Sequence, residues 1–217
     1  MRRRSVTVLT AVLFGMAALW LVRQPATSRA PSSGAASPST PSPAPPEPVA
    51  PSSPVAAVAE LVLAALQQRN MTALAMHVHP VKGLRFSPYI YVDPQRSVVL
   101  TAAELPRALN DPATRRWGTE DGSGDPIVQS FANYYARFVY DRDFRNATQR
   151  RVNEFGSRST TRPNIREVYP DATVVEAHVP GTKPESEGMD WSSLLLVFEQ
   201  YQSRWYLVAL VHDQWTI

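Results

Sequence analysis

The chain has 217 residues, no cysteine and a formal net charge of +3. The absence of cysteine excludes disulfides, thiolate metal sites and lipid attachment through an N-terminal cysteine. Residues 1–54 hold five arginines and one glutamate, a net +4, so the 22 basic and 19 acidic residues of the whole chain leave 17 and 18 for residues 55–217. Because this larger part has a net charge of −1, we expect no nucleic-acid partner.

Residues 1–23 have the pattern of a membrane-export segment. Arg2, Arg3 and Arg4 precede Ser5–Val22, a run without charge. A helix of that length spans about 27 Å, close to the hydrocarbon thickness of a bilayer. The arginines favour a cytoplasmic N-terminus and an extracytoplasmic remainder. We therefore predict a signal anchor with a transmembrane helix at about 5–22; a cleaved signal peptide, which would make the protein secreted, is the alternative.

Residues 24–54 are predicted to be a disordered linker. They hold ten of the chain's 20 prolines, mixed with serine and alanine. Such a segment has too little apolar area to offset the entropy of ordering, and it favours extended polyproline conformations. The linker would separate the membrane segment from a single globular domain at residues 55–217.

Helical patterns dominate the first half of this domain. Apolar residues at helical spacing predict a helix over 55–68, and Asn70 is placed to cap a second helix that continues to Met76. Thr101 and Glu104 form a capping-box pattern, which predicts a helix at about 102–109. A further helix is expected over 127–140.

Strand patterns dominate the last third. Residues 173–179 are rich in β-branched side chains, and 191–201 and 204–216 are long runs joined by Gln202-Ser203. A two-residue hairpin loop predicts that Tyr201 pairs with Arg204, and that Ser193 pairs with His212. Both faces of this ribbon are apolar, so we expect it to be central and covered on both sides.

This order predicts an α+β fold in which N-terminal helices pack on a strongly curved, conical antiparallel sheet, preceded by the transmembrane helix and the disordered linker. Four segments are similar to a group of uncharacterised exported bacterial proteins: Gly83–Tyr89, Asp121–Gly124, Gly188–Trp191 and His212–Ile217. At the level of fold, the domain resembles the nuclear transport factor 2-like superfamily, whose helices fill the mouth of a conical sheet. That resemblance implies a concave pocket, which some members use for isomerase, dehydratase or cyclase chemistry and many use only for binding.

Three side chains are candidates for acid–base chemistry: Glu176, His178 and His212. Glu176 and His178 alternate on one predicted strand and so share a face, whereas His212 and Asp213 are adjacent on a strand and point to opposite faces. The spacing of His77 and His79 at a helix end places them in different directions, and no zinc-protease motif accompanies them. We expect no metal and no cofactor.

Ligand-binding candidates come from several segments. Arg85 and Tyr89 alternate with aromatic residues after Gly83, an arrangement that can hold an anion or a planar ligand, or can tie a strand to a helix end. We expect a pocket walled by Trp191, His212 and Gln214, with Arg85, Tyr89 and His178 nearby. Asp121–Gly124 lacks the further residues of a cation or phosphate loop and is predicted to be a tight turn.

These features predict a membrane-tethered, extracytoplasmic binding or interaction module without catalysis. Its ligand would be a small molecule or an anionic component of the cell envelope, and the arginine-rich stretch Arg137–Arg166 is a candidate anion-facing surface. One alternative is a small metal-independent lyase or isomerase that uses a carboxylate or histidine as acid or base. Another is a structural envelope protein that forms a homodimer through the sheet face expected to wall the pocket.

Overall fold

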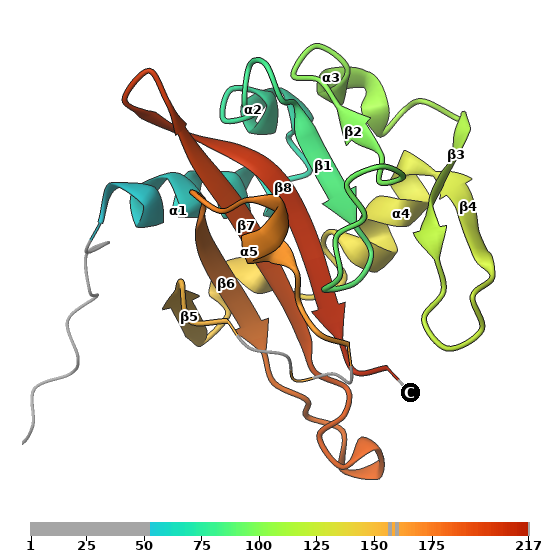
Figure 1. The fold of residues 1–217 in the computed structure, drawn as a ribbon. Helices are drawn as coiled ribbons and strands as arrows, with labels where there is room; N and C mark the ends of the chain where they lie inside the picture. Colours follow the sequence, from blue (N-terminus) through green and yellow to red (C-terminus); the bar gives the residue numbers. More distant parts are fainter. Residues whose placement is uncertain (1–52, 156–157, 159–160, 217) are drawn as a thin grey trace, which may run out of the picture. The chain divides into compact units, whose positions relative to one another are not determined.

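The structure is a computed structural model that describes residues 53–155, 158 and 161–216 (Figure 1). The predicted membrane segment and nearly all of the predicted linker lie outside these residues. Within the described part of the chain, no helix combines the length and apolar character needed to cross a membrane. The elements are α1 (Pro54–Gln67), α2 (Met71–Ala75), β1 (Leu84–Ser87), β2 (Val99–Leu100), α3 (Leu105–Ala108), β3 (Thr114–Thr119), β4 (Pro126–Ser130), α4 (Phe131–Phe138), η1 (Phe144–Asn146), β5 (Gln149–Val152), α5 (Ile165–Val168), β6 (Thr173–Val179), η2 (Pro184–Ser186), β7 (Ser192–Tyr201) and β8 (Arg204–Gln214).

A six-stranded sheet, ordered β2-β1-β8-β7-β6-β5, organises this α+β domain. The hairpin of β7 and β8 is central, as the sequence predicted, because β6 and β1 pair with its two edges. The expectation of a wholly antiparallel sheet is wrong at one place, since β1 runs parallel to β8. A parallel pair needs a long connection, and the chain between these two strands includes most of the domain.

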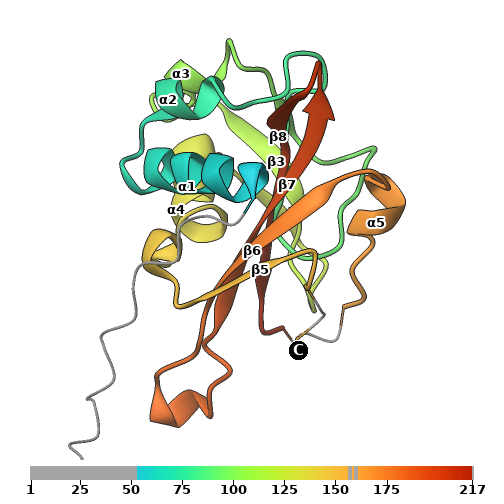
Figure 2. The same cartoon turned by 90° about the vertical axis from the view of Figure 1, so that its left-hand side faces the viewer.

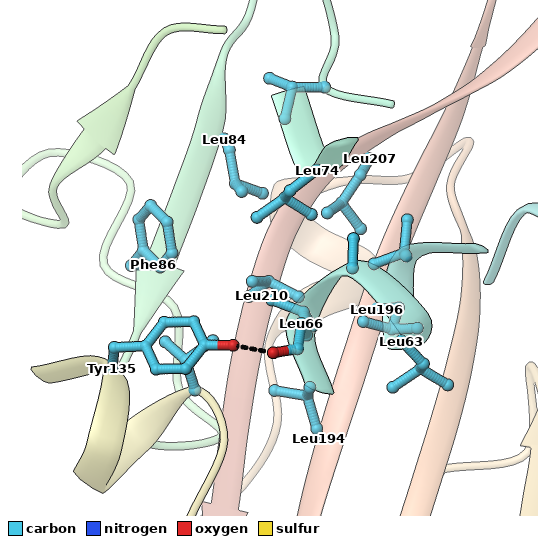
Figure 3. Close-up of a cluster of buried hydrophobic side chains, with 14 of the residues drawn as sticks. Leu63, Leu66, Leu74, Leu84, Phe86, Tyr135, Leu194, Leu196, Leu207 and Leu210 are labelled. Carbon is cyan, nitrogen blue, oxygen red and sulfur yellow. Dashed lines mark hydrogen bonds between the residues drawn. The ribbon is translucent and has the colours of Figure 1, made fainter. Parts of the chain in front are cut away.

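Helices α1 to α4 lie on one face of the sheet, and α5 lies on the other (Figure 2). Ser53 caps α1 by accepting from the Ala56 N–H, and Asn70 caps α2 by accepting from the Ala73 N–H. These caps confirm the first two predicted helices to within a residue or two. The helical layer buries a leucine-rich core against β1, β7 and β8 (Figure 3). In that core, the Tyr135 hydroxyl donates to the Leu66 carbonyl at the end of α1.

The opposite face of the sheet is also buried by the chain itself. Ile90 and Val92, from the loop after β1, pack there with Ile165 and Tyr169 around the outward side chains of the central strands. Asn164 fastens this cover, because its side chain accepts from the Val92 N–H at 2.7 Å and donates to the Val92 carbonyl at 2.8 Å. Both sheet faces are therefore covered, as expected from their apolar character.

Two helix predictions need correction. Residues 126–130 form strand β4 rather than the first turns of a helix, because β-branched residues there pair with β3 and Ser130 then caps α4. Near residue 102 the Glu104 carboxylate does accept from the backbone N–H and the hydroxyl of Thr101. That turn leads only into the single-turn helix α3, which begins at Leu105.

The predicted register of the central hairpin is right near the turn and wrong beyond it. Tyr201 pairs with Arg204, and Gln202 and Ser203 have the positive φ angles of a tight hairpin turn. A β-bulge at Val197/Phe198 then adds an extra residue on β8. Leu194, not Ser193, consequently pairs with His212, and Ser193 pairs with Asp213. The bulge places His212 on the helix-covered face, opposite to the predicted one.

Candidate ligand-binding cleft

A cleft of about 790 Å³ lies between the loop that follows β1 and the β3–β4 hairpin. This volume falls within the range of about 300–1,000 Å³ that small-molecule sites occupy. Both walls come from segments that connect or extend beyond the main sheet. The side chains that matter for its chemistry are Tyr89, Tyr91, Arg96, Arg116, Glu120 and Asp121.

Gly118 allows the two walls of the cleft to meet. It lies at the bulge between Arg116 and Gly118 in the β3–β4 pairing and has a φ of +150°, which L-residues rarely adopt. A Cβ at this position would lie 3.1 Å from Cγ of Pro88 in the opposite wall. Beneath this contact Trp117 is fully buried, and its indole N–H donates to the Gln129 carbonyl at 2.8 Å.

A hydrogen bond between Tyr89 and Glu120 joins the two walls. The Tyr89 hydroxyl donates to Oε2 of Glu120 at 2.8 Å, and Arg137 donates to both oxygens of that carboxylate. Burial and the bond to Glu120 raise the pKa of Tyr89 to about 12. The Arg137 hydrogen bonds hold the pKa of Glu120 below its usual value. Tyr89 is therefore a neutral phenol and Glu120 a carboxylate at neutral pH.

Arg85 supports the loop wall from behind instead of facing the cleft. Its Nε donates to the Tyr169 hydroxyl at 2.9 Å, and its Nη1 donates to the carbonyl of Pro94 at 3.1 Å. It lines a separate, smaller cavity of about 310 Å³ with Tyr169. The alternative stated above, that Arg85 ties a strand to a helix end, describes these contacts, because Tyr169 lies at the C-terminal end of α5.

His178 and Glu176 meet in a buried group that we call the Glu176 cluster, comprising Glu176, His178, Ser193 and Arg158. Ser193 Oγ donates to Oε1 of Glu176 at 3.0 Å and lies 2.8 Å from Nδ1 of His178. The carboxylate, which also pairs with Arg158, can only accept. We therefore assign the ring proton to Nδ1, which donates to the serine. Burial, then Arg158, lowers the pKa of His178, so this ring is neutral at pH 7.

A second group, the His212 cluster, comprises His212, Ser192 and Asp141 on the helix-covered face. Nε2 of His212 lies 3.0 Å from Oγ of Ser192 and 3.1 Å from Oδ1 of Asp141. The imidazole is fully buried, and the Phe138 ring packs edge-on against it, with 5.7 Å between the two ring centroids. Among the described residues, its Nδ1 has no hydrogen-bond partner.

The six predicted ligand-binding residues do not form one site. Trp191 lies beside His178, with ring centroids 5.8 Å apart, and Tyr89 lines the cleft. Arg85 is in the smaller cavity, and His212 is on the other face of the sheet from His178. Gln214 is half-buried at the end of β8. Asp121–Gly124 forms the turn of the β3–β4 hairpin, as predicted.

Sequence reasoning missed the cleft residues Arg96, Arg116 and Glu120. The sequence offers only a weak signal for them. The tight turn at Asp121–Gly124 would have indicated a hairpin if the segments on both sides of it had been predicted as strands. Within the described residues, no group of three or more histidine, aspartate and glutamate side chains is arranged to hold a metal ion. Most arginines of the Arg137–Arg166 stretch also have partners inside the domain, among them Arg142, Arg150 and Arg166.

No protein-family model matches the chain, and no curated protein matches it. Among solved structures, one described as a calcium/calmodulin dependent protein kinase II association domain from Xanthomonas campestris is similar to it, with a TM-score of 0.33 and 14% sequence identity. The similarity covers 74% of this chain and 84% of that chain. At this TM-score the likeness carries no argument about ligand or activity.

Proposed function

We propose that the chain is a non-catalytic binding module that holds a small-molecule ligand in the cleft between the loop after β1 and the β3–β4 hairpin. In this proposal residues 1–23 anchor the protein in a membrane, residues 24–54 act as a spacer, and the domain faces the extracytoplasmic side. The α+β domain would be a variant of the nuclear transport factor 2-like cone.

The observation that carries the proposal is the cleft itself. Its volume suits a small ligand, its walls are tied together by Tyr89 and Glu120, and exposed polar and aromatic side chains line it. These features describe a preformed site whose two walls are joined by a hydrogen bond. Preformed walls reduce the ordering cost of binding.

The enzymatic alternative receives less support from the geometry. Glu176 and Ser193 are 1% and 0% exposed, and His212 is 0% exposed. Each histidine uses a ring nitrogen to bond a buried serine from a neighbouring strand. A general acid or base must come within hydrogen-bond reach of its substrate, so these contacts favour structural roles. The dimer alternative required an open apolar sheet face, and that face is covered by the domain's own residues.

The binding proposal can be tested by filling the cleft. Thr119→Trp would place an indole among the lining residues, whereas Thr114→Trp changes an exposed position on the same strand outside the cleft. Trp is well tolerated in strands. Full-length protein in detergent micelles would be screened against a fragment library by amide chemical-shift mapping. We expect hits that shift Gly118 and Glu120, that weaken at least tenfold in Thr119→Trp and that persist in Thr114→Trp. A library without such hits would refute the proposal.

The proposed location has its own test. Full-length protein should sediment with membranes and resist extraction by alkaline carbonate. A protease added to cells whose outer envelope layer has been permeabilised, but whose cytoplasmic membrane is intact, should remove a C-terminal epitope tag. Recovery of the intact chain in the cytosolic fraction would refute the anchor, without bearing on the cleft.

A further inference from the structure

We infer that the ligand of this cleft is a small acid, a molecule with a carboxylate or phosphate group, recognised by the exposed guanidinium groups of Arg96 and Arg116. This inference rests on the proposed function, because it names the ligand class for the same site. Neither arginine was a candidate in the sequence.

The carboxylates that line the cleft already have donors in the protein. Glu120 accepts from Tyr89 and from both ends of the Arg137 fork. Asp93 Oδ1 accepts the backbone N–H groups of Gln95 and Arg96. These bonds use up acceptor capacity that a cationic ligand would otherwise need.

Asp121 is engaged in the same way. Its Oδ1 accepts from the Gly122 N–H at 3.1 Å, and its Oδ2 accepts from the Thr161 hydroxyl at 3.4 Å. Tyr89 is engaged too, because its hydroxyl donates to Glu120. The acceptors of the cleft are thus largely committed to the hairpin and the loop that build it.

The two arginines that line the cleft, in contrast to its carboxylates, have hydrogen-bonding groups available for a ligand. Arg96 and Arg116 are exposed, and no described residue forms an ion pair or side-chain hydrogen bond with either guanidinium. A guanidinium carries five N–H donors in a planar fork that matches the geometry of a carboxylate or a phosphate. The spare hydrogen-bonding capacity of the cleft is therefore that of a donor with positive charge.

Formal charge alone would not lead to this conclusion. If Arg137 is included, the cleft contains three arginines and the three carboxylates Asp93, Glu120 and Asp121, which sum to zero. The two signs differ in availability, because the carboxylates are hydrogen-bonded within the protein, whereas the guanidinium groups of Arg96 and Arg116 have no partner in the part of the chain that the structure describes. Tyr91 adds an aromatic surface beside them, since its side chain is 56% exposed and lines the same cleft. An acid with a planar or ring-shaped body would use both features.

Two sets of probes that differ only in charge test the inference. The first is benzoate, benzyl alcohol and benzylammonium, and the second is glucuronate, glucose and glucosamine. Each would be titrated into full-length protein in detergent micelles at low ionic strength, with the amide resonances of Gly118 and Glu120 as the readout. We expect the acid of at least one set to bind at least tenfold more tightly than its neutral and cationic partners, and the affinity to fall as salt is added.

Variants assign the preference to the named groups. The double variant Arg96→Ser/Arg116→Ser should lose the tenfold preference, while Arg107→Ser should keep it, because Arg107 is an exposed arginine on α3 outside the cleft. Tyr91→Ala should weaken benzoate. The inference is overturned if the neutral or cationic probes bind as tightly as the acids, if the double variant keeps the preference, or if no probe of either set shifts the cleft. The first two outcomes leave the binding proposal standing, and the fragment screen with Thr119→Trp decides that proposal separately.

Discussion

Two neighbouring tyrosines on α4 should respond in opposite directions to the same substitution. Tyr134 and Tyr135 are both buried, but only Tyr135 has a described acceptor, the Leu66 carbonyl. The Tyr134 hydroxyl has no hydrogen-bond partner among the described residues, while its ring stacks on Trp117 at 4.1 Å between centroids. Tyr→Phe removes one oxygen from each position and leaves the ring packing intact.

The magnitudes follow from what each oxygen does. Tyr135→Phe should cost about 1 kcal/mol, since the Leu66 carbonyl retains the Arg69 N–H at 2.9 Å and is not left unsatisfied. Tyr134→Phe should stabilise the fold by about 1 kcal/mol, because an unpaired buried hydroxyl costs about 1–3 kcal/mol in lost hydration. The two variants should then differ by about 2 kcal/mol, or about 4–8 °C in melting temperature.

Urea denaturation followed by far-UV circular dichroism measures this difference without depending on the fluorescence of the adjacent Trp117. Midpoints should move to higher urea for Tyr134→Phe and to lower urea for Tyr135→Phe, with unchanged slopes. If Tyr134→Phe instead destabilises the protein by more than 1 kcal/mol, its hydroxyl has a buried partner and the reasoning is refuted.

Three further expectations concern the cleft and the sheet. His178 has a lowered pKa in the folded state, so protonation favours the unfolded chain and the stability of the fold should decrease as the pH drops below about 6.5. The urea midpoint should therefore decrease between pH 7 and pH 5, and His178→Gln should make that decrease smaller. An equally large decrease in the variant would contradict this assignment. Gly118→Ala should lower the free energy of unfolding by about 1–3 kcal/mol, as measured by the same denaturation, because of its positive φ and the facing wall. Arg137→Gln should cost at most about 1 kcal/mol, since the pair is partly exposed. The same variant should raise the pKa of Glu120, and a carboxyl ¹³C titration that shows no rise would contradict the assigned cause.

Periodicity in the sequence was sufficient for the elements that bury a regular face. The first two helices have helical apolar spacing and an asparagine or serine cap, and the central hairpin has long apolar runs around a two-residue turn. The β3–β4 hairpin escaped prediction because its strands lack clean alternation. Arg115 and Arg116 interrupt one of them, and the other leads directly into α4, so the helical pattern of α4 was extended backwards over it.

The bulge on β8 had the largest consequence for the candidate site. A single additional residue exchanges the faces of every side chain beyond it, because strand side chains alternate with period two. Counting from the turn without the bulge put His212 opposite Ser193 and near His178. In the structure His212 pairs across from Leu194, so the two histidines belong to separate clusters on opposite faces.

The positions of the polar residues separate stability from recognition in this domain. Glu176, His178 and His212 lie on central strands, are buried and form hydrogen bonds within their own clusters, so substitutions there should act first on folding. Arg96 and Arg116, in contrast, lie on the loop after β1 and on the β3–β4 hairpin, where both side chains are exposed. Neither arginine contributes to the buried core, so changes at these positions can alter the ligand at little cost to the sheet. For that reason, the loop and the hairpin, more than the histidines of the strands, are where differences in binding between proteins with this domain should be sought.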